Sequence, residues 1–121
     1  VKIVGPVPPE ALAQRMARSF CLLNPSTIES FCMVALEAMA AGCPVLVTDK
    51  SAMPESVGAA GIVVSGEGEE GFVTALLELA DDEGKRQKAI QSGRNRAGDF
   101  TIDNFAKKFA GILQLTERVV H

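Results

Sequence analysis

The chain has no tryptophan, no tyrosine and a single histidine, His121, at its last position. We therefore expect no acid–base chemistry that depends on a histidine, such as that of a Ser-His-Asp set. The three cysteines, Cys21, Cys32 and Cys43, lack CxxC spacing, which argues against a zinc site or a disulfide framework. Unpaired cysteines of this kind are typical of a reducing compartment, so we expect a cytoplasmic protein.

Charge of one sign and long apolar runs are also scarce. The net charge is −3, which leaves no basic field to hold a nucleic-acid backbone. No stretch reaches the roughly 20 apolar residues of a membrane-spanning helix, and no signal-peptide pattern opens the chain. The hydrophobic fraction of 47% against 22% charged residues predicts a globular fold, and we expect one domain over residues 1–121.

Short apolar runs alternate with helical periodicity, which predicts an α/β fold with a Rossmann-like parallel sheet and helices on both faces. About four strands are expected, at residues 1–4, 20–23, 44–48 and 61–64. Helices are expected from Pro8-Pro9 onward, at residues 31–41 with Gly42 as the terminating glycine, and at residues 54–57. Three further helices after Gly71 should form a C-terminal helical cap over the sheet.

Four strands are fewer than a doubly wound sheet usually has. The fold is then a compact solo domain, or its first strand–helix units were lost, or another chain supplies them.

Two carboxylates stand eight positions apart at the predicted start of the 31–41 helix, an E-x7-E spacing formed by Glu29 and Glu37. Eight residues are a little over two helical turns, so a helix would bring both to nearly one face. Most neighbours of Glu37 are apolar, so we expect it to be buried and to need a partner such as a ribose diol. The free N–H groups at the helix start suit a diphosphate. Together these features fit a nucleotide sugar.

Each of these features has a structural alternative. Ser26-Thr-Ile-Glu29 also fits a capping box, in which the two side chains satisfy backbone N–H groups. An isolated glutamate within a helix, as at Glu37, is most often a surface residue. Cys32 at the helix start lacks a histidine base, which argues against a nucleophile. Pro54-Glu55 follows the third strand at the ligand-binding edge of such sheets, but it also suits a plain helix start.

The same region resembles the C-terminal domain of the family-4 retaining glycosyltransferases, over nearly the whole chain. The pattern consists of Val4-Gly5-Pro6-Val7, Pro25-Ser26, Glu29, Phe31, Leu36-Glu37-Ala38-Met39-Ala40 with Gly42, Pro44-Val45, Pro54-Glu55, Gly61 and Phe100-Thr101.

The resemblance implies that this is the nucleotide-sugar-binding half of a two-domain enzyme that needs no metal and no cofactor. Glu29 would be the catalytic-site carboxylate that contacts the sugar hydroxyls. The N–H groups of Cys32 and Met33 would face the diphosphate, and Glu37 would hold the ribose. The donor-contacting set is completed by Ser26, Ser30 and Phe31.

Two departures from the family pattern leave two functions open. Ser30 and Cys32 stand where the family usually has glycine, and the family's phosphate-binding Arg and Lys would lie upstream of residue 1. The first hypothesis is a donor-binding domain, inactive alone, that works with an acceptor domain or partner chain. The second is a non-catalytic binding or assembly module, possible as a homodimer through an open sheet edge. A receiver-like signalling domain is disfavoured, because the acidic cluster and lysine it needs are not evident.

Overall fold

The computed structural model describes residues 1–66 and 68–120, with side chains as far as residue 114. The expectation for His121 lies outside the described residues, as does Glu67. The sheet consists of β1 (Leu22–Asn24), β2 (Val45–Thr48) and β3 (Ile62–Val64), all parallel, in the order β1-β2-β3. Three of the expected strands are confirmed, and with them the α/β class.

The strand expected at residues 1–4 is not formed. This segment is extended and exposed, with Ile3 94% accessible. Its apolar residues favour a strand, but a strand is stable only beside a partner, and residues 1–4 pair with none of the three described strands. The sheet therefore has three strands rather than about four.

One face of the sheet carries α1 (Pro9–Arg18), α2 (Met33–Ala40) and α3 (Met53–Val57), the last continued by the 3-10 turn η1 (Gly58–Ala60). The side chains buried between these elements form the main core: Met16, Ala35, Leu36, Met39, Val45, Val47, Met53 and Val57. Gly42 ends α2 as expected, because its φ of +81° allows the N–H groups of Gly42 and Cys43 to bond back to Met39 and Ala38.

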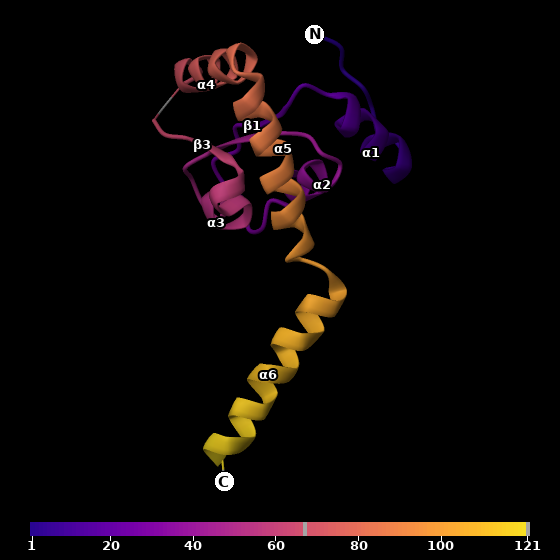
Figure 1. Cartoon of the computed structure of the whole chain (residues 1–121), viewed down its shortest axis with the longest axis vertical. Coiled ribbons are helices and arrows are strands. Elements are labelled where there is room, and N and C mark those ends of the chain that lie inside the picture. Colours follow the sequence, from indigo (N-terminus) through magenta and orange to yellow (C-terminus); the bar gives the residue numbers. More distant parts are fainter. Residues whose placement is uncertain (67, 121) are drawn as a thin grey trace.

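The other face is covered by α4 (Glu70–Asp81), which packs against β3 where Gly71 meets Val64. The next helix, α5 (Glu83–Gly98), crosses α2 (Figure 1). The approach of α5 to α2 is close at Gly93, where an added Cβ would lie 3.2 Å from Cγ of Met39. Helices on both faces of the sheet are thus confirmed.

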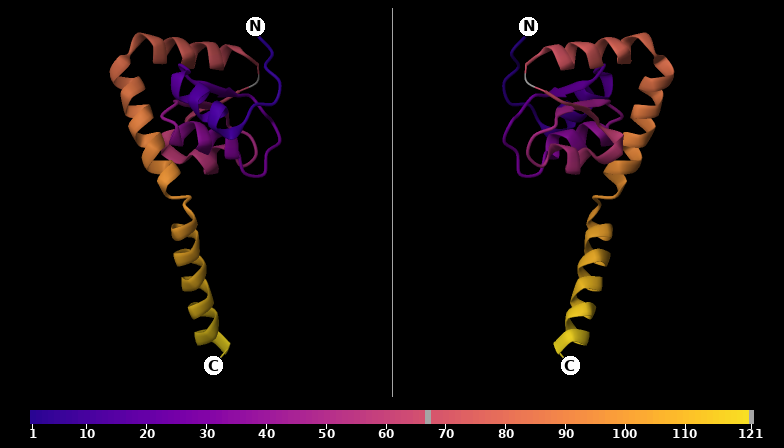
Figure 2. Two further views of the ribbon diagram at one scale, coloured as in Figure 1. Left: turned by 90° about the vertical axis from the view of Figure 1, so that its right-hand side faces the viewer. Right: turned by 90° about the vertical axis from the view of Figure 1, so that its left-hand side faces the viewer.

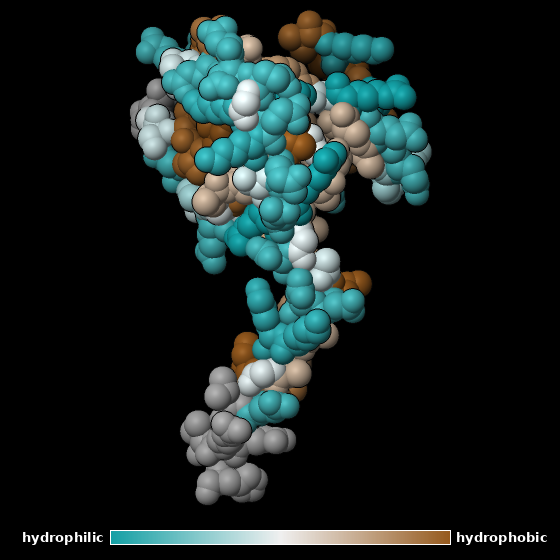
Figure 3. Space-filling view, in the orientation of Figure 1, coloured by the Kyte–Doolittle hydropathy of each residue, from teal (hydrophilic) through white to brown (hydrophobic). Residues whose placement is uncertain are grey.

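The last helix, α6 (Ile102–Val120), does not join the cap that the sequence predicts. It leaves the body of the protein as a separate rod (Figures 1 and 2). As far as residue 114, its large apolar side chains stay accessible, with Phe105 69% and Phe109 51% exposed. Figure 3 shows apolar residues on this rod beyond the compact body. The cap therefore consists of α4 and α5.

Candidate functional site

Most of the predicted site residues lie in the irregular segment of residues 25–32, which joins β1 to α2. The segment is hydrogen-bonded to the loop after β2. Thr48 Oγ1 donates to the carbonyl of Ser26 (2.7 Å), the Glu29 N–H donates to Ser51 Oγ (3.2 Å), and the Ala52 N–H donates to the carbonyl of Glu29 (3.3 Å). These bonds fix the position of Glu29 at the carboxyl end of the sheet.

The helix begins at Met33, two residues later than predicted, and Glu29 lies four residues before it, in the loop. The Ser26–Glu29 capping box is not formed, since no helix begins at residue 27; instead the N–H of Ser26 donates to Asn24 Oδ1 (3.1 Å). The argument that helical spacing puts Glu29 and Glu37 on one face therefore does not apply. The position of Glu29 relative to Glu37 is set by the conformation of the loop before α2.

The two positions where the resembling family has glycine are accommodated in different ways. Ser30 is exposed at the surface, whereas Cys32 is fully buried and its Sγ accepts a hydrogen bond from Asn24 Nδ2 (3.2 Å). The thiol of Cys32 thus turns into the core and away from the surface of the loop. Within the described residues, the N–H groups of Cys32 and Met33 donate no hydrogen bond. The start of α2 therefore presents free donors beside an exposed Met33.

Glu37 is exposed, which corrects the expectation that its apolar neighbours bury it. Because α2 packs its Ala35, Leu36 and Met39 inward, the helix turns Glu37 toward solvent on the same side as Met33 and Ala40. The carboxylate stands between two hollows. One, of about 340 Å³, is lined on its other side by α1 and the preceding segment (Val7, Pro9, Leu12, Ala13 and Met16).

The second hollow beside Glu37 measures about 710 Å³ and runs from α2 to the α5–α6 junction. Phe31, Met33 and Leu36 line its α2 side, and Phe100 and Phe105 line its far side. Of the predicted site residues, this hollow brings together Phe31, Met33 and Glu37. The α1 residues and Phe100 were not predicted as parts of the site, because only the tertiary packing places them near α2.

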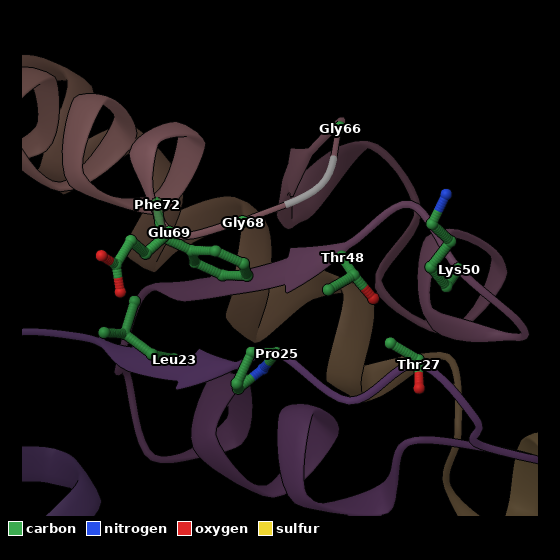
Figure 4. A pocket seen from close by; sticks show the side chains of 9 residues that line it. All are labelled: Leu23, Pro25, Thr27, Thr48, Lys50, Gly66, Gly68, Glu69 and Phe72. Atoms are coloured by element: carbon green, nitrogen blue, oxygen red, sulfur yellow. The ribbon is translucent and has the colours of Figure 1, made fainter.

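A third cavity, of about 570 Å³, opens at the carboxyl ends of the strands on the α4 side of the sheet. Figure 4 shows the ring of Phe72 lying over β2, with Leu23 and Pro25 on the β1 side. Thr27, Thr48 and Lys50 line the end of this cavity, and none of them was predicted from the sequence.

Two of the cysteines are held in the thiol form. Burial raises the pKa of Cys43 to about 11, and Cys21 nearby adds to the effect, while Arg86 opposes it. Burial also raises the pKa of Cys21. Neither thiol is therefore set up as a nucleophile at neutral pH. Among the described residues no group of three or more His, Cys, Asp or Glu side chains gathers as metal ligands would.

The fold is an α/β fold with an open parallel sheet, and such proteins usually bind ligands at the carboxyl ends of the strands. In this chain the free start of α2 lies at that edge, and the exposed Glu37 stands beside two hollows. The model of the family described as "Glycosyl transferases group 1" matches residues 1–96. This chain belongs to that family.

Curated relatives agree with this assignment. The chain is 32% identical to the D-inositol 3-phosphate glycosyltransferase of Corynebacterium kroppenstedtii over 94% of its own length and 26% of the relative's. It is 36% identical to the protein of the same name from Kribbella flavida, over 82% of the chain and 24% of the relative. The O-antigen chain mannosyltransferase B of Escherichia coli is 31% identical over 86% of the chain and 27% of the relative.

The chain thus spans about a quarter of the length of the curated relatives it matches. Within the part of the chain that the structure describes, no helix is long and apolar enough to cross a bilayer.

Proposed function

We propose that this chain is the nucleotide-sugar-binding part of a retaining glycosyltransferase, which acts only together with an acceptor-binding part. The observation that carries the proposal is the start of α2, where free N–H groups stand close in the chain to an exposed glutamate, Glu37. Such a helix start favours a diphosphate, and a carboxylate four residues further on accepts hydrogen bonds from a ribose diol.

In this proposal the nucleoside occupies the hollow between α1 and Glu37, which its lining supports. Pro9, Leu12 and Met16 present apolar surface on one side, and the Glu37 carboxylate stands on the other. An apolar wall with one polar anchor is the usual lining of a small-molecule site. The sugar end would then lie toward Glu29 and Phe31, where Ser26 and Ser30 supply further polar atoms.

Binding can be tested by thermal unfolding of the full chain with millimolar UDP-glucose, GDP-mannose and ADP-glucose. A ligand present at 100 times its Kd adds about 2.7 kcal/mol to the free energy of unfolding, which raises Tm by several degrees. Absence of any shift with all three sugars contradicts the proposal. No transfer of sugar is expected from the chain alone.

Glu37→Gln tests the ribose contact. Losing a charged hydrogen bond should raise the Kd for the nucleotide sugar by about tenfold to a hundredfold, since such bonds contribute about 1.5–3 kcal/mol. Glu78→Gln on α4 is the matched control, because Glu78 is also exposed and pairs with Lys85 at the surface. An equal effect of both substitutions would remove Glu37 from the site.

A second function, assembly without catalysis, is favoured by the open edge of the sheet. The Leu22 N–H donates to the Pro44 carbonyl, just before β2, so the backbone groups of Leu22 point toward β2. Because successive residues of a strand point their backbone groups to opposite edges, the N–H and C=O of Leu23 point to the side of β1 that has no partner strand. An edge of this kind can pair with a second copy. Light scattering over a range of concentrations decides this point: a monomer throughout excludes the homodimer, and a dimer that Leu23→Lys dissociates supports it.

A further inference from the structure

Phe31, one of the predicted site residues, packs against an aromatic ring from a distant part of the chain. Its ring meets that of Phe100 edge to face, with centroids 5.5 Å apart and planes at 64°. Phe100 lies between α5 and α6, two residues before α6 begins. Edge-to-face contacts at this distance are favourable beyond the area they bury. The pair therefore ties the loop before α2 to the α5–α6 junction.

Phe100 is itself fixed by Arg96, one turn earlier on α5. The guanidinium carbon of Arg96 stands 4.7 Å from the centroid of the Phe100 ring. The same guanidinium donates to the carbonyls of Glu55 (2.7 Å) and Ser56 (3.1 Å) on α3. Since Arg96 is anchored on α3, the ring of Phe100 is held between a fixed cation and Phe31.

The contact between Phe31 and Phe100 lies at the part of the loop that hydrogen bonds do not hold. Hydrogen bonds hold the loop at Ser26 and Glu29, and Cys32 is held in the core by burial and by Asn24. Between these anchors, Ser30 and Phe31 take part in no hydrogen bond to another described residue. The ring of Phe31 is thus the means by which this tip of the loop is held.

We infer that Phe100 is a positioning residue of the donor site: through Phe31 it holds the tip of the 25–32 loop and the start of α2 in the conformation that binds the nucleotide sugar. The inference rests on the proposed function. It adds a residue from outside the loop, together with Arg96 as its anchor. A site held from α5 binds its ligand without first ordering the loop, which lowers the entropic cost of binding.

Cys32 provides a direct probe of the loop. Its thiol is fully buried next to Phe31, so opening of the tip should expose it to iodoacetamide. Phe100→Ala should speed the alkylation of Cys32 at least tenfold, measured peptide by peptide with mass spectrometry. Cys43, buried at the opposite end of the strands, serves as the internal reference and should react as slowly as in the parent. A general loss of stability would speed both cysteines.

Three further variants complete the alkylation experiment. Phe100→Tyr keeps the ring and should restore the parent rate at Cys32, whereas Phe100→Leu keeps only apolar volume and should not. Phe109→Ala is the matched control, because the Phe109 ring stacks on Phe105 of α6 and not on the loop. An unchanged rate at Cys32 in Phe100→Ala, or the same increase in Phe109→Ala, overturns the inference.

The second arm measures the Kd for UDP-glucose, GDP-mannose or ADP-glucose, whichever stabilises the parent. Phe100→Ala should raise this Kd about tenfold and Phe109→Ala should leave it unchanged. A faster Cys32 reaction with an unchanged Kd overturns the link to binding. If none of the three sugars binds the parent, the proposed function fails, while the alkylation rates still decide whether Phe100 holds the loop.

Discussion

On the α2 side of the sheet Val45 and Val47 of the central strand are at most 1% exposed. On the opposite side Leu46 of the same strand is also buried, but Leu23 of the edge strand β1 is 46% exposed. The difference follows from the connections. The helices α2 and α3 lie on the same side of the sheet, as right-handed crossovers between its parallel strands require, and α1 packs against α2 on that side. The helix α4 covers the other side. That side is closed over β3 and hollow over β1, where the 570 Å³ cavity lies. The α2 side of the sheet carries the main core, whereas the α4 side is covered over β3 and open over β1.

The largest change in the free energy of unfolding is expected in the main core on the α2 side of the sheet. Met39→Ala removes a side chain that is 1% exposed and packed between α2, the sheet and Gly93 of α5. We expect the free energy of unfolding to fall by about 2–5 kcal/mol, because the close approach of α5 prevents collapse of the cavity. Urea unfolding of Leu23→Ala is the comparison, with an expected loss below about 1 kcal/mol. Equal losses would mean that the α4 side of the sheet is also closely packed over β1.

The next effect concerns the anchor between α5 and α3. Arg96→Met removes the donors to the carbonyls of Glu55 and Ser56 and should cost about 1–3 kcal/mol, measured by the same urea titration. Lys88→Met on the same helix is the control, because Lys88 is exposed and makes no hydrogen bond within the described residues. Its expected change is within about 0.5 kcal/mol. A similar loss in both variants would contradict an anchoring role for Arg96.

A further effect is confined to alkaline pH. Burial raises the pKa of Cys43 to about 11, above the 9.0 of an ordinary thiol, so the unfolded chain loses this proton first. The contribution of the neutral thiol is fully present below pH 9 and decreases as pH rises toward 11. Cys43→Ala should therefore show a flatter decline in stability between pH 9 and 11 than the parent. Parallel declines would place the thiol in a more solvated setting than its burial indicates.

The smallest effect is expected at the surface between α4 and α5. Lys85 and Glu78 form an ion pair with side chains 45% and 57% exposed. Such pairs contribute little because water screens them, so Lys85→Ala should change the free energy of unfolding by less than about 1 kcal/mol. Thermal unfolding at low and high salt checks the estimate. A loss of unfolding free energy comparable to that of Met39→Ala would show that the Lys85–Glu78 pair is needed to hold α4 against the sheet.

Local patterns in the sequence were sufficient for most of the elements. The apolar runs around residues 22–24, 45–48 and 62–64, the prolines at the start of α1 and Gly42 at the end of α2 each act through their own neighbours, so their elements could be predicted. The strand at residues 1–4 failed for the opposite reason. Pairing requires a neighbour, and no local pattern states whether that neighbour is present.

The candidate site divides in the same way. The sequence alone determined which residue types meet at the end of β1 and the start of α2, because backbone direction and helix polarity follow from the order of the elements. Only the tertiary structure decided that Glu37 faces solvent, that the thiol of Cys32 turns inward and that Phe100 touches Phe31. These three facts depend on which side of each helix finds a partner, and partners distant in the sequence are brought together only by packing.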